Sequence, residues 1–85
     1  MNINQAGRLL NEANRKTICN TNSLEEFRGQ AENYYKLEKK GEEWSFVFVA
    51  CERNSKGIEE TIKTFENESE ASIFYYLYEL SKWYR

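Results

Sequence analysis

The stretch that most limits how this chain can fold is residues 43–52, a run of alternating side chains in which both alternating sets are apolar. In an extended strand Trp44, Phe46 and Phe48 share one face, and Val47 and Val49 share the other. A strand that is apolar on both faces is favoured where both faces are covered. We therefore expect a central strand with helices over one face and at least partial cover over the other.

Weaker strand patterns lie on both sides of this run. Residues 33–39 and 58–65 alternate, and Lys40 with Gly41 supplies the turn between 33–39 and the central strand. Residues 53–57 read as a loop, and residues 17–21 predict a short first strand. Residues 22–27 fit either a capped helical turn or a continued strand, and Gly29 ends the segment in either case.

Helical patterns stand at both ends of the chain. Residues 3–15 carry apolar groups at helical spacing, with Asn4 as the expected N-cap. A second helix is predicted near residues 68–83, because Asn67 followed by Glu70 resembles a capping box.

This order of elements predicts one α+β domain over residues 1–85. The expected architecture is an antiparallel β-meander of three to four strands, with the N-terminal and C-terminal helices on one face. The expected core includes four large side chains: Leu9, Phe46, Phe48 and Leu77.

Aromatic residues are concentrated in the terminal helix region. Seven of the thirteen aromatics fall within residues 65–85. Two overlapping apolar stripes run along this helix, the first formed by Ala71, Phe74, Leu77 and Tyr78 and the second by Ile73, Leu77, Leu80 and Tyr84. Residues 73–78 span the whole helix circumference, so some must face away from the sheet. We expect a contact with another protein through these residues: Tyr75, Tyr76, Trp83, Glu66 and Glu68.

The residue inventory argues against an enzyme. The chain has no His and no Asp, and its four Gly are widely separated. The commonest general base, the commonest metal ligand and a phosphate-binding loop are therefore missing from the sequence. We predict no catalytic residues, no cofactor and no metal. Cys19 and Cys51 are expected to be reduced, buried and structural.

Net charge and hydropathy bear on which partners the protein binds and in which compartment it acts. The formal net charge of −2 argues against nucleic-acid binding, which requires clustered Lys and Arg. The sequence shows neither a signal peptide nor a membrane-spanning apolar run, so we expect a cytoplasmic protein that does not contact membranes.

The arrangement resembles the small αβ immunity proteins of bacterial polymorphic toxin systems. The resemblance is carried by the strand at 44–51, the strand that ends in Thr64 and Phe65, the acidic turn at 66–71 and the aromatic terminal helix. It implies a cytoplasmic protein that binds and neutralises one toxin domain without catalysis. The alternative is a homodimeric accessory or regulatory domain, in which self-association buries the aromatic excess.

Overall fold

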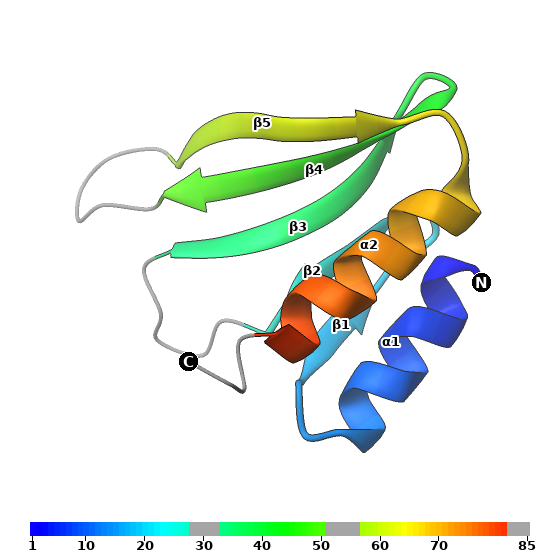
Figure 1. The fold of residues 1–85 in the computed structure, drawn as a ribbon. Helices are drawn as coiled ribbons and strands as arrows, with labels where there is room; N and C mark the ends of the chain where they lie inside the picture. The colour runs from blue at the N-terminus through cyan, green and yellow to red at the C-terminus, as the bar shows by residue number, and fades with distance from the viewer. Residues whose placement is uncertain (28–32, 51–56, 82–85) are drawn as a thin grey trace.

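The computed structural model describes residues 1–27, 33–50 and 57–81 of this chain. It contains two helices and five strands, and the sheet follows chain order from β1 to β5 with every neighbouring pair antiparallel (Figure 1). The elements are α1 (Ile3–Glu12), β1 (Thr17–Cys19), β2 (Ser23–Glu26), β3 (Asn33–Lys40), β4 (Glu43–Ala50), β5 (Ile58–Phe65) and α2 (Glu68–Ser81). Both helices cover the same face of the sheet (Figure 1). The α+β prediction is confirmed, with one strand more than expected.

The additional strand is β2, which settles the alternative left open at residues 22–27. Leu24 pairs with Leu37 of β3 and is fully buried. The backbone N–H of Asn20 donates to the carbonyl of Ser23 at 2.8 Å, which closes the turn between β1 and β2. Burial of Leu24 beneath α1 therefore favours the strand over a helical turn.

The doubly apolar segment forms β4, which is paired on both sides as predicted. Trp44 and Phe46 lie on the helix-covered face and are buried, whereas Phe48 on the same face is half-buried. Phe46 is the centre of an aromatic cluster, and its ring lies within about 5 Å of the rings of Tyr35, Phe74 and Tyr78. These edge and stacked contacts fix α2 over β3 and β4.

Helix α2 begins as the sequence predicts but turns a different face to the sheet. Asn67 Oδ1 accepts the backbone N–H of Glu70 at 2.8 Å, as expected of an N-cap. The buried positions are Ala71, Ser72, Tyr75 and Glu79. The prediction that Leu77 is a core residue is wrong, because 57% of its surface is exposed.

Helix α1 is shorter than predicted and is capped two residues earlier. Asn2 and Gln5 form a reciprocal capping box, in which each side chain accepts the other's backbone N–H. Asn4 is not the cap, since its side chain accepts from the thiol of Cys19 at 3.2 Å. Ile3, Ala6, Gly7 and Leu10 face inward, so Leu9 lies outside the inward stripe and is 38% exposed, contrary to the prediction.

Gly7 allows α1 to lie close to the β1–β2 hairpin. A Cβ at this position would be 3.1 Å from Cδ1 of Leu24, closer than side chains ordinarily approach. Thr17 strengthens the same contact, because its hydroxyl donates to the carbonyl of Gly7 at 3.4 Å. Within the described residues, neither helix has the length and apolarity that a membrane span requires.

Candidate protein-contact surface

Tyr75, expected at a partner contact, belongs to the core. It is fully buried, and its hydroxyl donates to the backbone carbonyl of Tyr35 at 2.8 Å. Burial, together with the nearby carboxylates of Glu79 and Glu26, raises its pKa well above the ordinary value. The phenol therefore stays protonated and keeps its role as donor. The contact prediction for Tyr75 is corrected on this evidence.

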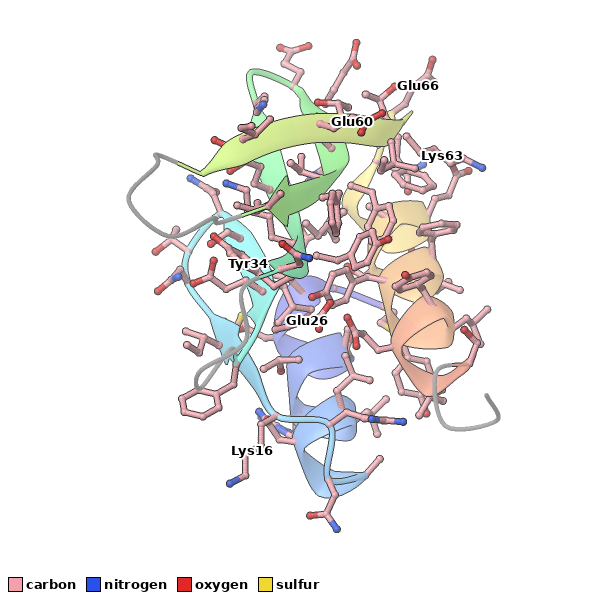
Figure 2. All side chains as sticks on the ribbon, turned by 90° about the vertical axis from the view of Figure 1, so that its left-hand side faces the viewer. Lys16, Glu26, Tyr34, Glu60, Lys63 and Glu66 are labelled. Atoms are coloured by element: carbon pink, nitrogen blue, oxygen red, sulfur yellow. The ribbon has the colours of Figure 1, made fainter. Side chains whose placement is uncertain are left out.

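Of the other predicted contact residues that the structure describes, one is exposed and two are half-buried. Tyr76 is half-buried on α2, and Glu66 is exposed just before that helix (Figure 2). Glu68 is half-buried, and its carboxylate accepts the backbone N–H of Ile3 at 2.9 Å. Glu68 therefore joins the N-terminal ends of the two helices, where a negative charge is favourable. Trp83 lies outside the described residues.

A second apolar stripe on α2 faces away from the sheet. Ile73 and Leu77 are 43% and 57% exposed, and Leu80 is half-buried. The spacing of four and then three residues places the three side chains along one side of the helix. We call Ile73, Leu77 and Leu80 the outward stripe, in which half-buried Leu80 also packs against the core. The sequence correctly indicated that some apolar groups of this helix face outward, but it named different residues.

The α1 side of the helix layer also has exposed apolar side chains. Met1 and Leu9 are each 38% exposed. The helices lie side by side with their N-terminal ends together, because Ile3 contacts Glu68 and the Met1 ammonium donates to Ser69 Oγ at 3.3 Å (Figure 1). With the same rise per residue on both helices, these two contacts place Leu9 level with residues 74 to 77 of α2. We call the outward stripe together with Met1 and Leu9 the helix-layer patch.

The surface around the α1 part of the helix-layer patch is hollowed. Met1, Gln5, Arg8 and Leu9 line a shallow depression of about 400 Å³. Arg8 and Gln5 supply polar groups beside the apolar chains of Met1 and Leu9. An apolar area with a polar margin is the usual composition of a protein contact.

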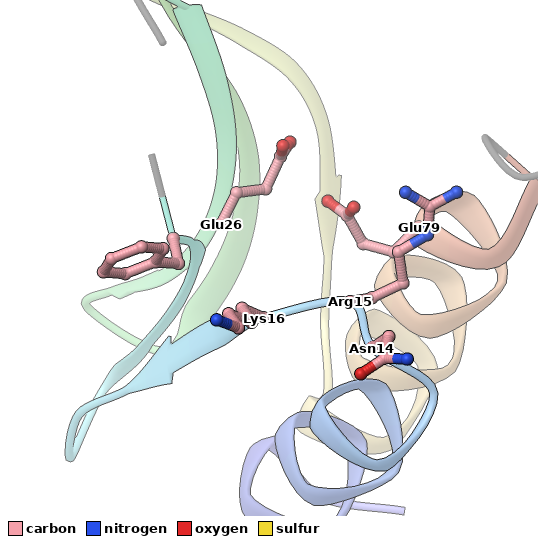
Figure 3. Close-up of a pocket in the computed structure, with 6 residues that line it drawn as sticks. Asn14, Arg15, Lys16, Glu26 and Glu79 are labelled. Carbon is pink, nitrogen blue, oxygen red and sulfur yellow. The ribbon is translucent and has the colours of Figure 1, made fainter. Parts of the chain in front are cut away.

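A smaller cavity lies at the opposite end of the helix layer. Its volume is about 280 Å³, and it is lined by Asn14, Arg15, Lys16, Glu26, Phe27 and Glu79. Figure 3 shows the carboxyl groups of Glu26, from β2, and Glu79, from α2, pointing into this space, which Arg15 enters from the segment after α1. Two cations and two carboxylates balance each other here, so the cavity favours neither an anion nor a cation.

The sheet face without helices is covered by charged side chains. Lys36 of β3 contacts Glu59 of β5 at 2.7 Å and Glu38 of its own strand at 3.0 Å. Val47 and Val49 of β4 lie on the same face and are nevertheless buried. The long charged side chains therefore shield the apolar groups beneath them.

Cys19 is a free thiol, but it is exposed rather than buried as predicted. Partial burial, and secondarily the charge of Glu68, raises its pKa, so the reactive thiolate is disfavoured. Cys51 lies outside the described residues. Among the residues that the structure describes, no three Cys or Glu side chains gather closely enough to hold a metal ion.

The sequence missed Ile73 and Leu77 because hydrophobicity alone did not distinguish the two faces of α2. The chain matches no protein-family model, no curated protein and no solved structure. The helix-layer patch is accordingly the candidate site on the evidence of its own geometry.

Proposed function

We propose that this protein is a non-enzymatic binding domain that contacts another protein through its helix-layer patch. The observation that carries the proposal is the outward stripe of α2, where Ile73 and Leu77 expose large aliphatic side chains although α2 also has a well-packed inward face. Single exposed apolar residues are normal on soluble proteins, whereas a helix with a second apolar stripe is typical of a contact surface.

The proposed partner is a bacterial toxin domain, and the proposed compartment is the cytoplasm. The resemblance to immunity proteins supports this class of partner. Glu66 and Glu70 are exposed at the start of α2 and place negative charge at one end of the helix layer. Such charge would assist association with a basic toxin domain by electrostatic steering.

The test uses the toxin domain encoded next to this chain in its own genome, measured by direct binding and by rescue of growth on co-expression. Ile73→Ser should fold normally and weaken binding by about tenfold or more, as expected of an interface anchor. Ile18→Ser is the matched control, since Ile18 on β1 is 41% exposed and Ile73 is 43% exposed. The control should bind like the wild type.

Two results would overturn the proposal. One is the absence of binding and growth rescue for the wild-type pair. The other is equal binding by the Ile73→Ser and Ile18→Ser variants, which would move the contact to another surface.

The second candidate function is a homodimeric accessory or regulatory domain. It is favoured by a separate observation at the β5 edge of the sheet, where the exposed side chains complement those of a second copy.

A further inference from the structure

Strand β5 is the long edge of the sheet. It contains eight residues and pairs along one side with β4, and no other described strand pairs with its second side (Figure 1). The opposite edge is much shorter, since β1 contains three residues, and the backbone N–H of Thr17 is occupied by Asn11 at 2.8 Å. β5 therefore offers the larger set of backbone groups for strand addition.

A bulge in β5 changes which side chains share a face. Phe48 pairs with Glu60 and Phe46 pairs with Lys63, so three residues of β4 span four residues of β5. Glu60 and Lys63 consequently lie on the same, helix-covered face as Phe46, although an odd spacing would put them on opposite faces of a regular strand. Figure 2 shows both side chains on β5 at the top of the sheet.

Four side chains of β5 share this face: Ile58, Glu60, Lys63 and Phe65. Read along the strand, their order is apolar, acidic, basic and apolar. The same series read backwards is apolar, basic, acidic and apolar. An antiparallel second copy therefore sets Glu60 opposite Lys63 twice, and Ile58 opposite Phe65 twice.

We propose that β5 pairs with β5 of a second copy around a two-fold axis between residues 61 and 62. The product is a symmetric dimer with one continuous sheet, in which each copy contributes its five strands. Cross-strand pairs of opposite charge and of apolar groups fix the register. The proposal does not depend on the helix-layer patch or on a toxin partner.

The same features explain why the occupant is this chain and not any extended peptide. Charges and bulges on an edge strand hinder pairing with unrelated strands. Here the bulge is matched by the bulge of the second copy, and each charge meets its opposite. Ile58 is 64% exposed in the single chain, and Ile62 at the bulge is 51% exposed. Pairing would cover part of both side chains.

Lys63 is held in a suitable position for this pairing. Its ammonium lies 5.4 Å from the ring centres of Phe65 and of Phe74, a distance typical of cation–π contacts. The side chain therefore stays on the helix-covered face, where Glu60 of the second copy would approach.

The experiment measures the dimer dissociation constant by sedimentation equilibrium at low salt. Glu60→Lys and Lys63→Glu should each weaken the dimer by about tenfold or more, because each replaces two attractive pairs with two repulsive ones. The double variant Glu60→Lys/Lys63→Glu restores opposite charges at both contacts and should return to near the wild-type value. Glu12→Lys on α1 makes the same charge change as Glu60→Lys away from β5 and should have no comparable effect.

A second measurement keeps the proposal testable if a charge variant folds poorly. A wild-type mixture of ¹⁵N-labelled and unlabelled chains, treated with a carbodiimide, should give Glu60–Lys63 cross-linked peptides of mixed isotope composition. A wild-type protein that stays monomeric at millimolar concentration would overturn the proposal. So would failure of the double variant to recover, or loss of the dimer only in Ile73→Ser, which would place the interface on the helix layer.

Discussion

Lys36 of β3 reaches across β4 to Glu59 of β5, with 2.7 Å between Nζ and Oε1. Lys36 pairs with Val47 and Glu59 pairs with Val49, so the ion pair lies over the valines of the strand between them. This relationship accounts for the burial of Val47 and Val49 on a face without helices. One pair of charged side chains thus covers part of the second apolar face that the sequence of β4 predicted.

Replacing Glu59 with Gln should reduce the loss of folding stability that occurs at acidic pH. The hydrogen bond to Lys36 and its positive charge lower the pKa of Glu59 below the ordinary value of 4.5. A carboxylate with a lowered folded-state pKa stabilises the fold above its unfolded pKa and loses that contribution as the pH falls through the folded value. Wild-type protein should therefore lose more stability than Glu59→Gln below about pH 4.5.

The measurement is a series of urea melts at decreasing pH. Glu12→Gln is the control, because Glu12 is exposed at the end of α1, away from Lys36 and from β5. Parallel pH profiles for wild type and Glu59→Gln would contradict the prediction. The effect should be modest, since Glu59 is partly exposed and exposed ion pairs contribute little.

Tyr75 should be more sensitive to loss of its hydroxyl than its neighbour Tyr76. Tyr75→Phe removes the donor to the carbonyl of Tyr35 and should cost about 1–3 kcal/mol, because that oxygen loses its buried partner. Tyr76 is only half-buried, so Tyr76→Phe should change stability by about 0.5 kcal/mol or less. Free energies of unfolding from denaturant melts give both values, and equal losses would argue against the described orientation of α2.

Truncating the buried Phe46 to Ala should cost much more folding stability than truncating the exposed Leu77 to Ala. Phe46 is 2% exposed at the centre of the aromatic cluster, and Phe46→Ala should cost about 3–5 kcal/mol. Leu77 is 57% exposed, so Leu77→Ala should cost no more than about 1 kcal/mol. If thermal or chemical melts show a large loss for Leu77→Ala, the outward stripe is packed in solution.

Gly7→Ala should fail to stabilise α1. Alanine ordinarily favours a helix interior over glycine by about 1 kcal/mol. The new methyl group would lie 3.1 Å from Leu24, which is fully buried and has little room to move. The free energy of unfolding of this variant should be equal to or below that of the wild type. An increase of about 1 kcal/mol would show that the β1–β2 hairpin shifts at little cost to make room for the methyl group.

The strands were largely predictable because alternation and turn residues act locally. The doubly apolar pattern of 43–52 identified β4, and Lys40 with Gly41 located the turn before it, where Gly41 has a positive φ of 65°. Residues 22–27 were ambiguous since their polar side chains suit either conformation. The pairing of Leu24 with Leu37 and its position beneath Gly7 favour a strand, and both contacts join residues more than ten positions apart.

The orientation of α2 was not predictable from hydrophobicity because apolar groups surround the helix. Two contacts decide it: Tyr75 donates to the backbone of β3, and Glu68 accepts the backbone N–H of Ile3 at the start of α1. Ser72, one turn after Glu68, is fully buried. A small buried serine allows two helices to approach closely. These contacts favour polar or small residues, so a search for apolar stripes overlooks them.

The chain-order topology described for the sheet also has a kinetic consequence. Each strand pairs with its neighbour in sequence, so the sheet can grow one hairpin at a time with little loss of chain entropy. The bond from Ile3 to Glu68 instead joins residues 65 positions apart. We therefore expect the two helices to dock after the hairpins have formed, and helix-interface variants such as Glu68→Gln to accelerate unfolding more than they slow folding.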